Sequence, residues 1–227
     1  MSEYISIAID GPAGAGKSTI AKKVAGELGY IYIDTGAMYR TMAYYYLQNN
    51  IDTKDEKAVS ELCDKIEVGL KYIDGVQHVL LNGDDVSGFI RTGEVGAAAS
   101  QISVYGAVRN SLLDLQRNMA KTNSVVMDGR DIGSVVLPNA QVKIYLTASV
   151  EERARRRYAE YVQAGQDCDL EKIKKEIEER DYRDMNRDIA PLVCADDAHV
   201  IDSSSMTIDE VCEAVFELVR KAGELKE

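Results

Sequence analysis

The chain has 227 residues, of which 45% are hydrophobic, and it carries a net charge of −11 at pH 7. This composition predicts one large α/β domain with a sizeable core and excludes a chain that is disordered throughout. The negative charge argues against a nucleic-acid backbone as the main partner, and no apolar run approaches the roughly 20 residues of a membrane span.

Strands and helices are predicted to alternate over the first 66 residues. In order, we expect a buried strand over residues 4–9 ending at Asp10, a glycine-rich turn (Gly11–Ser18), a helix (Thr19–Leu28), a strand (Tyr30–Asp34), a helix from Thr35 to about Asn49, and a helix whose period is carried by Ala58, Val59, Leu62, Cys63 and Ile66.

The pattern changes after residue 66. Three short extended runs, Val68–Ile73, Val76–Leu81 and Asp84–Val86, are separated by Asp74-Gly75 and Asn82-Gly83. Both dipeptides are strong hairpin signals. A small antiparallel insert is therefore expected at this point of the chain.

Alternation then resumes. The expected elements are a helix with its period at Val108, Leu112, Leu115 and Met119, strands at Val125–Met127 and Val142–Leu146, a helix from Ser149 to Gly165, a charged helix over about Leu170–Asp184, a strand at Val200–Ile201, and a C-terminal helix capped by Thr207-x-x-Glu210. Strands that alternate with helices predict a parallel sheet covered by helices on both faces.

The turn Gly11–Ser18 has the sequence G-P-A-G-A-G-K-S, which fits the phosphate-binding pattern G-x-x-x-x-G-K-[ST]. Backbone N–H groups of such a loop surround phosphates at a helix N-terminus. Lys17 is expected to reach the β- and γ-phosphates, and the Ser18 hydroxyl to bind Mg²⁺. A glycine-rich turn that binds nothing is the alternative, but the flanking strand and amphipathic helix favour the phosphate site.

Asp128 stands at the end of the predicted strand Val125–Met127. A carboxylate there is placed as a second Mg²⁺ anchor, directly or through water. Arg130 and Asp131 follow at the rim where open α/β sheets bind ligands. An Asp-Gly turn with a surface charge pair explains the same residues equally well on local sequence alone.

Eight of the thirteen arginines lie between residues 130 and 187. Besides Arg130, the cluster and its charged stripe comprise Arg153, Arg155, Arg156, Arg157, Arg180, Arg183, Asp184 and Arg187. In an acidic protein, such a cluster predicts a small phosphorylated ligand, although a solvated helix neutralised by glutamates is the alternative. No histidine lies near these motifs, which fits phosphoryl transfer, where positioning and charge neutralisation do most of the work.

The cysteines are far apart and form no C-x-x-C pair: Cys63, Cys168, Cys194 and Cys212. With only His78 and His199 besides, a zinc site is not expected. Residues 1–10 contain acids and alternate apolar with polar side chains, unlike a signal peptide. We therefore expect a soluble, cytoplasmic protein with reduced thiols.

Five motifs together resemble the bacterial cytidylate kinase family over essentially the whole chain. They are G-P-A-G-A-G-K-S-T (Gly11–Thr19), D-T-G-A-M-Y-R (Asp34–Arg40), N-G-x-D-V-S-x-x-I-R-T (Asn82–Thr92), D-G-R-D-I-G (Asp128–Gly133) and R-D-x-x-R-x-x-A-P-L (Arg183–Leu192). The resemblance implies a P-loop NTPase-type sheet and phosphorylation of CMP and dCMP to CDP and dCDP, with ATP and Mg²⁺. It also implies a core (1–66, 104–148 and 188–227), an acceptor-binding insert (about 67–103) and a helical lid (about 149–187).

The resemblance further implies residue roles. The ATP phosphates are expected at Gly11, Pro12, Ala13, Gly14, Ala15, Gly16, Lys17, Ser18 and Thr19, and Mg²⁺ at Ser18 and Asp128. For CMP, it implies Ser100, Arg109 and Asp131 at the base, Arg40, Arg130 and Arg187 at the phosphate, Arg180 and Asp184 near the sugar, and Thr35 and Tyr39 along the pocket. The expected catalytic residues are Lys17, Arg130, Arg153, Arg157 and Arg187.

Two departures and two rival functions accompany this resemblance. Cys194 stands where a proline or another non-thiol residue is expected, and position 18 varies in the family, so Ser18 is a less secure Mg²⁺ ligand than Lys17 is a phosphate ligand.

A kinase for UMP or for shikimate is one rival function, against which the insert and the Ser100/Asp131 pair argue. A nucleotide-gated switch is the other, but no N-K-x-D guanine motif is present. Small-molecule substrates, no nucleic-acid or membrane partner, and a monomer are expected.

Overall fold

The computed structural model describes residues 4–224. Within them, one sheet consists of the parallel strands β1 (Ser6–Asp10), β2 (Ile31–Asp34), β6 (Val125–Gly129), β7 (Val142–Thr147) and β8 (His199–Asp202), in the spatial order β2-β6-β1-β7-β8. The helices are α1 (Lys17–Leu28), α2 (Thr35–Gln48), α3 (Glu56–Leu62), α4 (Gly93–Ile102), α5 (Gly106–Thr122), α6 (Val150–Gln163), α7 (Leu170–Asn186) and α8 (Ile208–Glu224).

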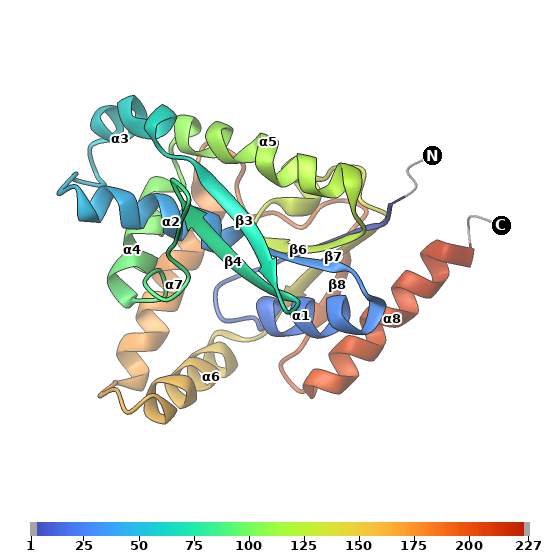
Figure 1. The fold of residues 1–227 in the computed structure, drawn as a ribbon. Coiled ribbons are helices and arrows are strands. Elements are labelled where there is room, and N and C mark those ends of the chain that lie inside the picture. Colours follow the sequence, from blue (N-terminus) through green and yellow to red (C-terminus); the bar gives the residue numbers. More distant parts are fainter. Residues whose placement is uncertain (1–3, 225–227) are drawn as a thin grey trace.

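Helices cover both faces of this sheet because its central strands are apolar on both sides (Figure 1). Ile7 and Ile9 of β1 pack into one core with α1 and α8. Ala8, between them, packs into the other core with α2, α4 and α5. Successive side chains of a strand point to opposite faces, so one strand supplies both cores. The α/β fold class with a parallel sheet and two helical layers is confirmed.

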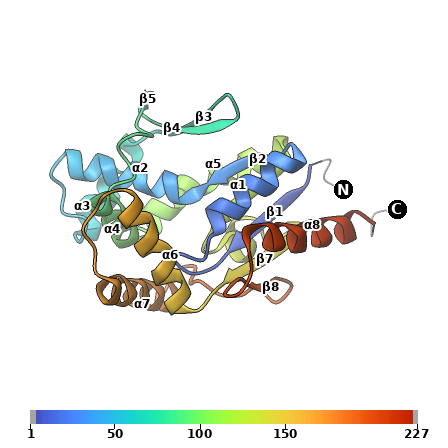
Figure 2. The same ribbon diagram turned by 90° about the horizontal axis from the view of Figure 1, so that it is seen from below.

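A second, antiparallel sheet of β3 (Val68–Ile73), β4 (Val76–Leu81) and β5 (Asp84–Asp85) forms the predicted insert. It is joined to the edge of the main sheet by hydrogen bonds: the Tyr72 hydroxyl donates to the Tyr32 carbonyl at 3.0 Å, and the Asp34 N–H donates to the Gln77 side chain at 3.0 Å. Figure 2 shows this hairpin on one side of α2 and the α6–α7 pair on the other.

The helices α6 and α7 pack on each other around a small cluster of their own, formed by Ala154, Ile173 and Ile177. Both helices are capped at their N-termini: the Ser149 side chain accepts from the Glu152 N–H at α6, and the Asp169 side chain accepts from the Lys172 N–H at α7. The division of the chain into core, insert and lid stays a prediction. No helix in the described part of the chain is long and apolar enough to cross a membrane.

Two elements were not predicted. One is α4, which lies inside the expected insert. The other is a π-helical turn, Ile132–Val136, directly after β6. Asp10 holds that turn: one carboxylate oxygen accepts from the Ile132 N–H at 2.8 Å, and the other from the Gly133 N–H at 2.7 Å.

Candidate active site

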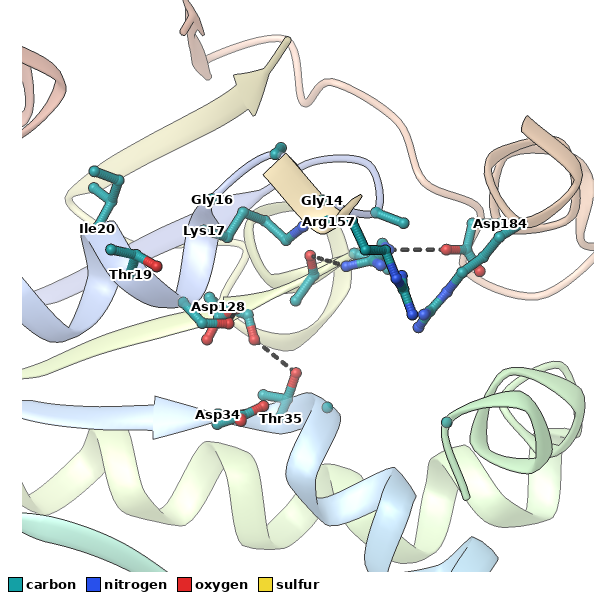
Figure 3. Close-up of a pocket in the computed structure, with 18 of the residues that line it drawn as sticks. Gly14, Gly16, Lys17, Thr19, Ile20, Asp34, Thr35, Asp128, Arg157 and Asp184 are labelled. Atoms are coloured by element: carbon teal, nitrogen blue, oxygen red, sulfur yellow. Dashed lines mark hydrogen bonds and ion pairs between the residues drawn. The ribbon is translucent and has the colours of Figure 1, made fainter. Parts of the chain in front are cut away.

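A cavity of about 650 Å³ lies where the phosphate loop, α2, the turn after β6, and the helices α6 and α7 meet. Most of the site residues expected from the sequence line it: Ala13, Gly14, Ala15, Gly16, Lys17, Ser18, Thr19, Thr35, Tyr39, Arg40, Ser100, Arg109, Asp128, Arg130, Asp131, Arg157, Arg180, Asp184 and Arg187. Gly11, Pro12 and Arg153 are not among the lining residues. Figure 3 shows Lys17, Asp128 and Arg157 around this space, with Asp184 beside it.

The phosphate loop follows β1 and depends on glycine at two points. At Gly11, which has φ +150°, a Cβ atom would lie 2.0 Å from the Leu146 carbonyl oxygen. Gly16 has φ +87° and caps the N-terminus of α1, so that the helix begins at Lys17. Only glycine adopts such conformations without strain. The loop is therefore fixed where the chain turns from strand into helix.

Lys17 is buried, and its Nζ donates to the Pro12 carbonyl at 2.7 Å. Burial lowers the pKa of this lysine well below its ordinary value, and the nearby Arg130 charge adds to the effect. A buried ammonium whose charge is costly is a strong partner for an incoming anion.

Asp128 receives hydroxyl donors on both oxygens: Ser18 at 2.9 Å on one and Tyr32 at 2.9 Å on the other. Burial raises its pKa to about 6, with a further contribution from the Asp34 charge. The described residues contain no group of three or more His, Cys, Asp or Glu that could hold a metal. Mg²⁺ needs fewer protein ligands, because it keeps waters and binds through one or two oxygen groups plus phosphates. The Ser18–Asp128 pair fits such an ion.

Asp131 and its arginines form the opposite end of the cavity. One oxygen of Asp131 pairs with Arg109, and the other lies 3.4 Å from Arg187. Burial raises the pKa of Asp131, and the two arginines oppose that rise. Arg130 donates through Nε to Asp184 at 2.8 Å.

Some buried donors in the described residues have no protein partner. They are the Nε atoms of Arg40 and Arg180, together with the Ser134 hydroxyl. Burial lowers the pKa of Arg180 to about 10, with Arg130 as the next cause. Arg40 donates to the Asp34 carboxylate at 2.8 Å through its Nη2 atom, not through Nε. Buried arginine donors that converge on a cavity are suited to an anion.

The arginines of α6 take different positions. Arg157 lines the cavity, where its Nε donates to the Tyr161 hydroxyl at 2.9 Å and its guanidinium lies over the Tyr161 ring. Arg155 is exposed. Arg153 is buried and donates to the Ala13 carbonyl at 2.8 Å, outside the cavity lining. The arginines of α6 therefore include one that lines the cavity, one that is exposed to solvent and one that is buried outside the cavity.

Sequence patterns placed Arg156 in the arginine cluster without giving it a role of its own, and they gave no role to several other residues of this cavity. Arg156 lines it and is held by the Ser203 carbonyl at 2.7 Å, and the start of α8 contributes Met206, Thr207, Ile208 and Val211. Asp34, which caps α2 and pairs with Arg40, also lines it. The Thr207-x-x-Glu210 capping box predicted where α8 starts. A local motif of this kind cannot predict that the start of the helix lies at the same cavity as the phosphate loop.

Comparisons with known proteins agree with this geometry. The family model described as cytidylate kinase matches residues 7–221. The chain is 52% identical to a cytidylate kinase of Caldicellulosiruptor bescii over 96% of each chain. It is 53% identical to a cytidylate kinase of Desulforamulus reducens over 97% of this chain and 99% of that one. Among solved structures, it is similar in fold to an uncharacterized protein from Eubacterium ventriosum, with a TM-score of 0.54 and 13% identity over 95% of this chain and 98% of that one.

Proposed function

The chain belongs to the cytidylate kinase family and is a kinase that phosphorylates CMP and dCMP, and from this premise we propose how its cavity does so. ATP is the phosphoryl donor and binds with its phosphates on residues 11–19. The acceptor nucleotide binds at the opposite end, between α2, the turn after β6 and α7. The γ-phosphoryl group passes between them across the centre of the cavity.

The donor end rests on the phosphate loop and Lys17. Lys17 leaves the Pro12 carbonyl and bonds the transferring phosphoryl group, where its charge opposes the negative charge that builds up. Ser18 and Asp128 would hold Mg²⁺, which would supply neutralisation of phosphate charge at this end of the cavity. The close contact of these two oxygen groups supports that assignment.

The acceptor end rests on two groups of residues. Asp131, with Ser100 and Arg109, binds the cytosine: its carboxylate can only accept a hydrogen bond, so it fits the N4 amino group of cytosine and repels O4 of uracil. Arg40, Arg130 and Arg187 bind the acceptor phosphate, while Arg180 and Asp184 face the sugar. Thr35 and Tyr39 complete the wall. All of these residues line one cavity, which supports the proposal.

The buried, unpartnered Nε atoms of Arg40 and Arg180 are the observation that carries it. An unpaired buried donor costs about 1–3 kcal/mol, and more for a charged group. The guanidinium groups that carry these atoms line a cavity that Lys17 and Arg157 also line, so a bound phosphate can supply the acceptors and the negative charge that the protein does not. Neither a surface ion-pair network nor a non-binding turn explains the unpartnered Nε atoms.

A coupled assay of ADP release tests this function with CMP, dCMP, UMP, AMP and shikimate as acceptors. We expect rapid ADP release with CMP and dCMP and little with the others. Lys17→Met should reduce kcat at least about 1,000-fold while the thermal transition is retained, because it removes charge stabilisation in a dry site. Equal rates with UMP or shikimate, or turnover of the Lys17→Met variant within tenfold of the parent, would contradict the proposal.

We further propose that the enzyme works as a monomer on small-molecule substrates in the cytoplasm. One chain supplies residues at both the donor end and the acceptor end of the cavity, so no second copy is needed to complete it, and the four cysteines are free thiols, as expected in a reducing compartment. A mass of one chain by light scattering, unchanged on addition of CMP and an ATP analogue, is the expected result.

A further inference from the structure

Both polar groups of the Ala13 residue, in the phosphate loop, are held by one buried ion pair. The Ala13 N–H donates to one oxygen of Asp181 at 3.0 Å, and the Ala13 carbonyl accepts from Arg153 at 2.8 Å. Arg153 and the other oxygen of Asp181 are 2.5 Å apart. Their side chains are 5% and 9% exposed. A carboxylate and a guanidinium therefore close a ring on the backbone of a single residue of the loop.

Arg153 also ties this ring to the main sheet. Its Nε donates to the Ala148 carbonyl at 2.9 Å, just beyond the end of β7. Arg153 lies in the first turn of α6, whereas Asp181 lies in the C-terminal half of α7. The two helices are thus fastened to the phosphate loop at their bases, and the chain that joins them, residues 164–169, lies at the far end.

The helix that carries Asp181 also carries residues of the acceptor end. Asp184, three residues on and on the same face, holds Arg130 at 2.8 Å, and the neighbouring Arg180 lines the cavity. Just beyond the helix, Arg187 approaches Asp131 at 3.4 Å. Because a helix moves as a rigid element, a shift of α7 toward a bound acceptor is transmitted through Asp181 to the Ala13 peptide.

We propose that Arg153 and Asp181 are a positioning pair that couples acceptor binding to the geometry of the phosphate loop, so that CMP tightens the binding of ATP. The inference rests on the proposed donor and acceptor ends of the cavity. Neither side chain lines that cavity, so the pair acts through Ala13 rather than on substrate. This replaces the expected catalytic role of Arg153 with a positioning role. A merely structural ion pair would change stability but leave the coupling between the two ligands intact, because coupling is a separate free energy.

Isothermal titration of a non-hydrolysable ATP analogue with Mg²⁺, without CMP and at saturating CMP, measures this coupling. For the parent protein, we expect CMP to tighten binding of the analogue at least about fivefold, with the same factor in the reciprocal titration. Asp181→Asn should bring the factor to within about twofold of unity and lower kcat about tenfold or more. The affinity for CMP alone should stay within about threefold of the parent.

Two further variants keep the test decisive. Arg153→Lys preserves the charge, but one ammonium cannot replace the three contacts of the guanidinium, so it should lose coupling while remaining folded. Asp197→Asn removes the carboxylate that pairs with the buried Lys143 at 2.7 Å, away from the cavity lining. It should lower the melting temperature yet keep the parent coupling.

The inference is overturned if the parent shows no coupling, or if folded Arg153→Lys or Asp181→Asn protein keeps it. A different result would instead remove the proposed function. If the parent binds neither ligand, or if Lys17→Met binds the analogue and turns over as the parent does, then the assignment of the cavity itself is wrong.

Discussion

At the scale of single residues, the carboxylate of Asp131 shows how charge and hydrogen-bond direction are fixed together. Arg109 and Arg187 approach its two oxygens from different elements, α5 and the segment after α7. They keep the buried group oriented and oppose the rise in its pKa that burial causes. A carboxylate held in this way presents only acceptor lone pairs to a base.

Asp131→Asn should therefore lower kcat/KM for CMP by about 100-fold and affect UMP much less, because the amide can donate toward a carbonyl oxygen. The ratio of kcat/KM for the two acceptors is the measurement. Asp188→Asn changes an exposed carboxylate outside the cavity lining and serves as the matched control. If the CMP/UMP ratio is the same in Asp131→Asn as in the parent, then Asp131 does not contact the base.

Local motifs predicted the cavity residues that follow a strand or belong to a helix stripe, such as Lys17, Asp128 and Arg180. They included Arg156 in the arginine cluster but gave it no role of its own, because its partner, Ser203, is 47 residues away along the chain. They also could not separate Arg153 from Arg157, which share a helix face. Which of two neighbouring arginines meets a carboxylate depends on α7, and sequence spacing within α6 carries no information about it.

At the scale of elements, two glycines of α1 and its C-cap have opposite conformational requirements. Gly26 lies inside the helix with no atom within 4 Å of a built Cβ, while Gly29 ends it at φ +67°. The first position gains nothing from glycine, and the second needs it.

Gly26→Ala should raise the free energy of unfolding by roughly 0.5–1 kcal/mol, and Gly29→Ala should lower it by about 1 kcal/mol. Urea titrations of both variants measure these changes. Neither glycine lines the cavity, so kcat should stay at the parent value in both. Destabilisation by Gly26→Ala would show that a neighbour restricts this position in solution.

Asp10 fixes the π-helical turn that follows Arg130 and Asp131. Its carboxylate accepts from two backbone N–H groups, yet burial, the largest cause, raises its pKa from 3.8 to about 6. A carboxyl with a raised pKa in the folded state binds its proton more tightly when folded. It therefore lowers stability progressively as the pH rises from about 4 to about 6, and by a constant amount above that range.

Asp10→Asn removes this pH dependence and, because one N–H loses its acceptor, adds a constant cost. The stability advantage of the parent over the variant should shrink by up to about 3 kcal/mol between pH 4 and pH 7. Urea unfolding at both pH values measures it. Asp197→Asn should show little change in this difference over the same range, because Lys143 holds the pKa of Asp197 below its ordinary value and its contribution to stability changes mainly below pH 4. A parent-to-variant difference that is the same at both pH values would contradict the role of Asp10.

Hydrophobic periodicity predicted every strand of the main sheet and the hairpin of the insert, because β-branched runs and Asp-Gly or Asn-Gly turns are local signals. It missed α4, whose sequence GEVGAAASQI is rich in small residues and contains two glycines, which disfavour a helix. That helix forms where Ala98 and Ala99 are buried in the core shared with α2. The π-helical turn was missed because the carboxylate that holds it lies 122 residues earlier.

At the scale of the whole molecule, the α6–α7 pair is fastened near the phosphate loop and free of it farther out. Arg153 and Ala154 are the buried residues of α6, whereas Tyr158 and Val162 are 38% and 53% exposed. Arg157 lies between these two regions. A segment of this kind can close over two bound nucleotides while its base stays attached to the phosphate loop, which limits hydrolysis of ATP before the acceptor arrives.

Arg157→Ala should lower kcat by about 10- to 100-fold and raise the KM for CMP by no more than about threefold, since its charge is needed when the phosphoryl group moves. Steady-state kinetics with CMP varied at saturating ATP give both constants. Arg155→Ala, which changes an exposed arginine of the same helix, is the control and should match the parent. A rise in KM at unchanged kcat would assign Arg157 to uniform binding of the acceptor instead.

Amide hydrogen exchange tests the closure itself. The amides of Glu152 and Arg153 should exchange slowly even without added nucleotide, because they donate to the Ser149 hydroxyl and the Ser149 carbonyl and the Arg153 side chain anchors this turn. Residues 156–170 should exchange fast and become protected when a bisubstrate analogue that joins adenosine and cytidine through phosphates is added. The central strands, protected throughout, supply the internal reference. If the analogue does not change exchange over residues 156–170, closure is excluded and Arg157 is a fixed part of the cavity wall. If the analogue protects these residues in the parent but not in Asp181→Asn, closure is connected to the Ala13 peptide.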